Sequence, residues 1–155
     1  MSQTGQEPIS ALRPLTPLIG TWTVEASFPG AEPTGAAGRT EFDWAVGGTY
    51  LVQRTHIDSP HAPDSMCIVS NALSSGYYRQ HYFDSRGIVR VYEMSFLDGE
   101  WTLLREEHDF SPLDFSQRFT GRLSDDGNTI EGEWEIAHDR ATYEHDFFLT
   151  YKRII

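Results

Sequence analysis

Apolar and polar residues alternate with a period of two along nearly the whole chain after residue 18, and this pattern constrains the fold more than any other feature. A period of two is typical of a β-strand with one buried face, because successive side chains point to opposite sides of a sheet. The clearest case is the segment 130–136 ("IEGEWEI"), in which three glutamates alternate with Ile130, Trp134 and Ile136. No segment between strands has the dozen or so helix-forming residues that a parallel crossover needs. The sequence therefore predicts an all-β, antiparallel fold.

Turn signals divide this pattern into ten predicted strands. Short connectors such as "VGGT", "DSRG", "LDGEW" and "SDDGN" carry glycine where a tight hairpin needs a positive φ angle. Two longer connectors, 29–38 and 58–65, are rich in proline and small residues, and we expect them to rim an opening. The expected strands are 19–28, 38–46, 49–57, 66–73, 76–84, 87–96, 100–109, 115–124, 128–137 and 141–153.

Closing a sheet of about ten strands removes both of its hydrogen-bonding edges. This favours a single antiparallel up-and-down β-barrel, with a two-sheet sandwich as the alternative. The 155 residues fit one domain, 1–155, with one core. Within it we expect a loose tail at 1–8, a short helix or turn at 9–18 that plugs the barrel, and the barrel itself at 19–153; Pro14 and Pro17 limit the helix to a turn or two.

The charge balance bears on partners. Asp and Glu number 23 against 12 Lys and Arg, a net charge of −11, so phosphate backbones and anionic membranes would be repelled. We therefore expect neither nucleic acid nor a membrane as partner. The single cysteine, Cys67, the absence of a signal-peptide pattern and the absence of a long apolar run predict a cytoplasmic protein. The pattern leaves monomer and homodimer open.

Following the apolar face of each strand predicts that polar side chains also point into the barrel. Burying an unpaired polar group costs about 1–3 kcal/mol, so such groups should pair with one another, with water or with a ligand. Two simpler alternatives stay open: register slips at bulges turn some of them outward, or Glu93 and Glu107 form a closed internal network with Arg79 and Arg105. The expected ligand-binding residues are Gln53, Tyr77, Arg79, His81, Glu93, Arg105, Gln117, Tyr143 and His145.

Gly20 and Trp22 at the first strand, with Arg153 at the end of the last, resemble the calycin superfamily of lipocalins, fatty-acid-binding proteins and nitrobindin. The motifs "LIGTWTVE", "GGTYLVQR", "YFDSRG", "DGEWTL" and "TIEGEWEIAHDRATYEHDFFLTYKR" look most similar to an uncharacterised bacterial domain family within it. The resemblance implies a barrel with an interior site, closed at one end by Trp22 with Arg153 packed across its face. It implies no particular chemistry.

The nitrobindin resemblance implies haem held by one histidine, but this chain has no clear counterpart of that family's C-terminal histidine segment, and His81 or His145 would have to substitute. The histidine spacings do not predict a metal site either. We therefore expect no cofactor, with haem as a minor alternative.

The favoured function is binding of a small, partly apolar molecule inside the barrel. If the molecule carries an anionic head, Arg79 or Arg105 would pair with it. The alternative is general acid/base catalysis of an isomerase, cyclase or lyase type, with Glu93, Glu107, His81 and His145 as candidate catalytic groups. A third possibility, an interaction module, would need an exposed apolar face.

Overall fold

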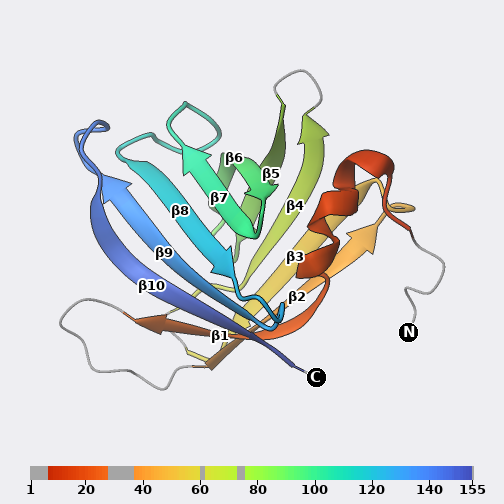
Figure 1. Cartoon of the computed structure of the whole chain (residues 1–155). Helices are drawn as coiled ribbons and strands as arrows, with labels where there is room; N and C mark the ends of the chain where they lie inside the picture. Colours follow the sequence, from red (N-terminus) through yellow and green to blue (C-terminus); the bar gives the residue numbers. More distant parts are fainter. Residues whose placement is uncertain (1–6, 28–36, 60–61, 73–75, 155) are drawn as a thin grey trace.

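The computed structural model describes residues 7–27, 37–59, 62–72 and 76–154. Ten antiparallel strands close into a barrel in which each strand pairs with the next and β1 pairs with β10 (Figure 1). The predicted all-β up-and-down barrel is confirmed. Its strands are β1 (Gly20–Ser27), β2 (Ala37–Ala45), β3 (Tyr50–Ile57), β4 (Ser65–Ala72), β5 (Tyr77–Asp84), β6 (Val89–Leu97), β7 (Glu100–Arg105), β8 (Ser116–Leu123), β9 (Thr129–Ala137) and β10 (Glu144–Arg153).

Two strands are shorter than predicted by three or more residues. β7 ends at Arg105 rather than at residue 109, because the next residues turn into a loop whose Asp109 bonds back to Arg105. β10 begins at Glu144 rather than at 141, because the Asp139 carboxylate accepts hydrogen bonds from the amides of Ala141 and Thr142 and so holds a turn. Residue 28, residue 73, the tail at 1–6 and most of the connector at 29–38 lie outside the described residues.

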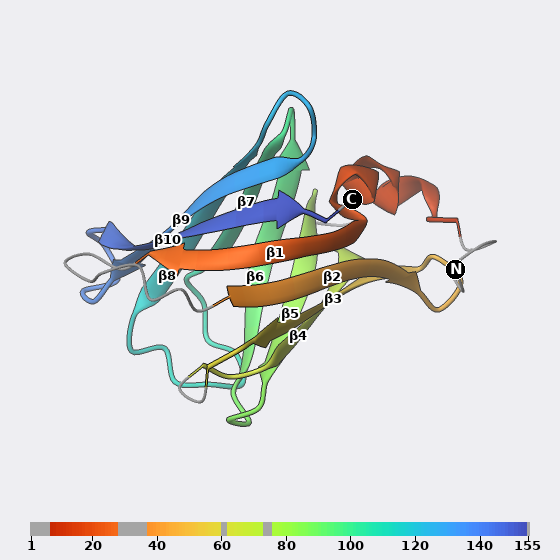
Figure 2. The same cartoon turned by 90° about the horizontal axis from the view of Figure 1, so that it is seen from below.

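The N-terminal segment forms the predicted short helix, a 3-10 helix named η1 (Ser10–Leu18). Its nine residues make about three turns and include both Pro14 and Pro17, so the helix is longer than the turn or two expected. Its Leu12, Leu15 and Leu18 are completely buried, because a repeat of three residues places all three on one side of a 3-10 helix. The hydroxyl of Tyr78 on β5 donates a hydrogen bond to the carbonyl of Ala11 and fixes the helix against the barrel. η1 therefore covers one end of the barrel, as Figure 2 shows.

Aromatic side chains fill the middle of the barrel. Trp101 has edge contacts with Phe42 and Phe119 at ring-centroid distances of 5.8 and 4.9 Å, and Phe119 packs on Trp134 at 5.2 Å. Tyr92 in turn meets Trp134 edge-on at 5.8 Å. Such pairs stabilise the core beyond the area they bury.

We call the opposite end of the barrel the polar end. There β1, β3, β5, β7 and β9 finish, and the connections 84–89, 105–116 and 137–144 lie away from η1 (Figure 2). No helix within the described part of the chain is long and apolar enough to cross a membrane.

Candidate ligand-binding site

Strand register decides which side chains enter the barrel, since residues directly opposite each other in an antiparallel pair point to the same side. Starting from the buried Trp22, this rule can be followed around all ten strands. It places Gln53, Arg105 and Gln117 on the inner face, as the sequence predicted.

On β5 and β6 the opposite face points inward. Tyr78 pairs with Met94 and Gln80 with Tyr92, and these buried or half-buried residues face the core. The expectation that Tyr77, Arg79, His81 and Glu93 line the interior is therefore wrong. Both faces of β5 mix aromatic and polar or charged residues, and both faces of β6 mix apolar and charged residues, so hydropathy did not distinguish them.

A bulge explains a second correction, on β10. The register of β10 against β9 shifts between His145 and Phe147. The extra residue turns His145 outward, where its Nδ1 lies 2.7 Å from the Glu133 carboxylate. Tyr143, before β10, also lies outside: its hydroxyl donates to Glu106 and the Arg118 guanidinium stacks 4.1 Å above its ring. Neither residue reaches the interior.

Four of the predicted residues do come together, but on the outer surface. Glu107 is exposed in the loop after β7 and so cannot serve an interior site. With Arg79, His81 and Glu93 it lines an outer groove of about 390 Å³ over β5, β6 and β7. An interior acid/base site therefore loses all four of its predicted catalytic groups, Glu93, Glu107, His81 and His145.

The polar end is organised around a buried ion pair between Arg105 and Asp109. Nε and Nη2 of Arg105 donate to the two carboxylate oxygens at 2.7 and 2.8 Å. The same carboxylate accepts from the amides of Val91 on β6 and Ser111 in the loop. Burial by itself raises the pKa of Asp109, but these hydrogen bonds outweigh it and lower the pKa to about 2. The pair fastens the loop 105–116 across the edge of β6.

Further inner-face hydrogen bonds surround this pair. The Tyr92 hydroxyl donates to Oε1 of Gln117 at 2.8 Å, and burial raises the pKa of Tyr92 to about 12, so the phenol stays protonated. On the other side of the barrel, Nε2 of Gln53 donates to the Thr40 hydroxyl, which also lies 2.7 Å from the Thr55 hydroxyl. The interior of this half is a polar network rather than a closed apolar core.

Four buried inner-face atoms have no hydrogen-bond partner among the described residues: Oε1 of Gln80, Nε of Arg90, Nε1 of Trp101 and Nη1 of Arg105. Gln80 and Arg105 are only 3% and 1% exposed. Buried polar atoms are normally paired, so each marks a place where water or a ligand group completes the network. Arg90 lies opposite Tyr82 on the inner face and stacks 5.5 Å from the Phe115 ring centroid.

Sequence reasoning missed Gln80, Arg90 and Tyr92. The apolar residues Met94 and Phe96 lie on the same face of β6 as Tyr92 and Arg90, and Met94 is only 1% exposed. Taking these two residues as the buried face would have identified the inner side of the strand.

A histidine-bound haem does not fit the described residues. The strand histidines 56, 81 and 145 point outward, and 108 and 138 lie exposed in loops. His61 lies outside the described residues. The middle of the barrel, moreover, is filled by rings. Among the described residues there is also no group of three or more His, Cys, Asp or Glu side chains that could hold a metal ion.

Comparisons with known proteins identify the fold. No family model matches the chain, and no curated protein does. Among solved structures, the chain is similar to the crystal structure of Rv2717c from M. tuberculosis, with a TM-score of 0.67 and 14% sequence identity over 96% of this chain and 100% of that one. At this identity the likeness shows the barrel fold alone.

Proposed function

We propose that this barrel binds a small molecule with an apolar body and an anionic or carbonyl-bearing head, held at the polar end of its interior. The observation that carries this proposal is the set of unpartnered buried atoms on Gln80, Arg90 and Arg105. Two of the three belong to guanidinium groups, which donate hydrogen bonds and accept none. A head group with oxygen acceptors satisfies both.

The charges at this end favour an anion. The inner-face carboxylate of Asp84 is bound by Arg86 and Tyr82, and Asp109 is bound by Arg105. Arg90 has no carboxylate of the described residues within ion-pair distance. One positive charge at the inner face is therefore uncompensated, and the rings of Tyr92, Trp134 and Phe115 offer apolar surface beside it.

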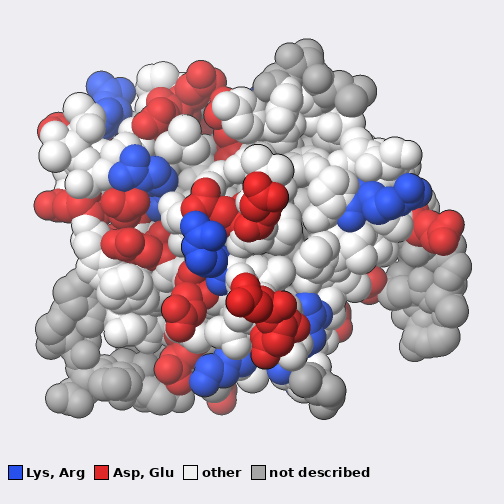
Figure 3. Space-filling view, viewed as in Figure 1, with Lys and Arg blue, Asp and Glu red and all other residues white. Residues whose placement is uncertain are grey.

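We also propose that the protein is related to the calycins, is located in the cytoplasm and is a monomer or a homodimer. The calycin relationship is supported by the arrangement of Gly20, Trp22 and Arg153 at the closed end. The net charge of −11 disfavours nucleic acid and anionic membranes as partners. On the face seen in Figure 3, the described acidic and basic side chains are intermixed and form no broad basic patch.

Titration calorimetry with octanoate and its uncharged analogue 1-octanol tests the proposal. The wild-type protein should bind octanoate more tightly than 1-octanol, and Arg90→Gln should weaken octanoate binding about tenfold, the value of one charge-assisted hydrogen bond. Arg13→Gln, which removes the same charge from the exposed face of η1, is the matched control and should bind as the wild type does. Equal affinity of wild type and Arg90→Gln for octanoate would contradict the assignment.

A further inference from the structure

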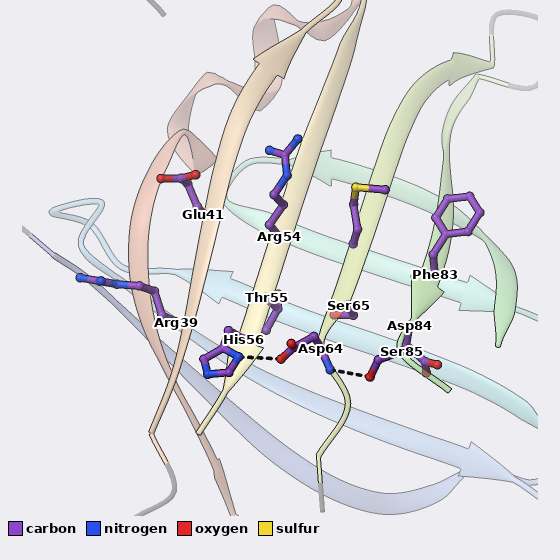
Figure 4. A pocket seen from close by; sticks show the side chains of 11 residues that line it. Arg39, Glu41, Arg54, Thr55, His56, Asp64, Ser65, Phe83, Asp84 and Ser85 are labelled. Atoms are coloured by element: carbon purple, nitrogen blue, oxygen red, sulfur yellow. Dashed lines mark hydrogen bonds and ion pairs between the residues drawn. The ribbon is translucent and has the colours of Figure 1, made fainter. Parts of the chain in front are cut away.

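A second groove, of about 540 Å³, runs over the outer face of β2, β3, β4 and β5 near the polar end (Figure 4). Its middle is one row of directly opposed residues, Glu41, Arg54, Met66 and Phe83, which the register places side by side across the four strands. Because these residues alternate with the inner-face Phe42, Gln53 and Cys67, they point away from the interior. This row therefore faces away from the interior, whereas Thr55, Ser65 and Asp84, which also line the groove, belong to the inner face at the polar end.

The groove combines an apolar floor with exposed positive charge. Met66 and Phe83 are half-buried, so their side chains form a surface rather than project into solvent. Arg54 lies directly opposite Met66 and is exposed (Figure 4). No carboxylate of the described residues lies within ion-pair distance of its guanidinium. A volume of this size is in the range of small-molecule sites, roughly 300–1,000 Å³.

Most acidic groups of the groove already have partners. Asp64 lies 2.6 Å from Nδ1 of His56, and its amide is hydrogen-bonded to the Ser85 hydroxyl (Figure 4). Asp84 is held by Arg86 and by the Tyr82 hydroxyl, and although burial alone raises its pKa, these hydrogen bonds lower it to about 2. Glu41 is the exception, since it is exposed and faces Arg54 across the β2–β3 pair without forming an ion pair.

We infer that this groove is a second binding site, for a small amphipathic anion whose ring or short chain lies on Met66 and Phe83 and whose carboxylate meets Arg54. Arg39, exposed on β2 directly opposite His56, adds a second positive charge to the groove (Figure 4). Glu41 weakens the site, because its carboxylate competes for the guanidinium and repels an incoming anion. Removing the positive charge of Arg54 should therefore weaken anion binding, and removing the negative charge of Glu41 should strengthen it.

The test is a two-dimensional ¹H–¹⁵N NMR titration with 1-naphthoate, repeated with the neutral 1-naphthalenemethanol. Naphthoate should shift the amide signals of Arg54, Met66 and Phe83 in a saturable manner. Arg54→Gln should weaken binding about three- to fivefold and Glu41→Gln should strengthen it about twofold, magnitudes typical of exposed charge pairs. Both side chains are exposed, and the spectrum itself reports whether each variant is folded.

Two control variants separate this site from the interior one. Arg13→Gln changes net charge equally and should leave the groove titration unchanged, and Arg90→Gln should leave it unchanged as well, whether or not the interior proposal holds. Shifts confined to residues of the polar interior, equal binding of the neutral alcohol, no saturable shift at all, or unchanged affinity in Arg54→Gln would each overturn the inference.

Discussion

The contact between Arg153 and Trp22 explains why the chain enters its first strand through a glycine. The guanidinium carbon lies 4.1 Å from the indole centroid, and the side chain also donates hydrogen bonds to the carbonyls of Ile19, Pro17 and Gly127. Gly20 has a φ of +130°, and a Cβ atom there would lie 2.8 Å from Nη1 of Arg153. The glycine thus leaves room for the arginine that covers the tryptophan.

We expect Trp22→Ala to lower the free energy of unfolding by about 3–5 kcal/mol, because the indole is fully buried and its Nε1 donates to the Leu18 carbonyl. Arg153→Met keeps most of the packing, so it should lower the free energy of unfolding by less than Trp22→Ala does. Loss of the cation-π contact should account for about 0.5–2 kcal/mol of that decrease. Denaturation in urea measures both. Trp22→Ala with wild-type stability would show that the indole does not close the barrel.

The Asp109 carboxylate makes a prediction about pH. Its pKa in the folded protein, about 2, lies below the ordinary value of 3.8. The stabilisation is therefore complete above about pH 4 and is lost as the pH falls toward 2. Asp109→Asn should be less stable than wild type at pH 7 by on the order of 2 kcal/mol and should lose less stability on acidification through that range. Asp125→Asn, which changes an exposed carboxylate, serves as the control. If Asp109→Asn and wild type lost the same stability between pH 4 and pH 2, the role of the ion pair would be contradicted.

At the scale of strands, a pair of glycines makes room for the central ring. Gly121 on β8 and Gly132 on β9 lie directly opposite each other on the inner face. A Cβ atom on either would lie 2.9 or 2.5 Å from the Phe119 ring. The Phe119 ring therefore occupies the space that side chains at these two positions would fill.

Gly132→Ala should destabilise the barrel by about 1–3 kcal/mol through overpacking. Adding Phe119→Leu removes the ring that clashes, so the double variant should lose less than the two single variants together. Thermal unfolding of the four proteins gives this coupling energy, and strict additivity would show that the ring does not occupy the space above the glycine.

The buried face of a strand could be predicted from the sequence only where its two faces differ clearly in hydropathy. β9, with glutamates on one face and large apolar residues on the other, has a sequence that specifies its orientation. β5 carries aromatic and charged residues on both faces, β6 carries apolar and charged residues on both faces, and β10 contains a bulge that no local sequence pattern indicates. The barrel and its strand order were therefore predictable, whereas Arg79, His81 and Glu93 were assigned to the wrong side.

For the whole molecule, closure of the barrel separates two kinds of end. η1 and Trp22 seal one end with apolar side chains, and the polar end gathers Arg90, Arg105 and their neighbours within a chain whose net charge is −11. Of the residues predicted to line the interior, only Gln53, Arg105 and Gln117 lie on the inner face. They lie on strands whose apolar face could be identified from the sequence. An interior positive charge in an acidic protein is the feature that the ligand proposal explains.

Native mass spectrometry of the protein as isolated, followed by extraction under denaturing conditions, tests the proposed interior site most directly. We predict a mass increment from a small molecule with a carboxylate or another oxygen-bearing head, present in the wild type and in Arg13→Gln and reduced in Arg90→Gln. The bare chain mass in every sample, with no increment after incubation with octanoate, would contradict ligand binding at the polar end of the barrel.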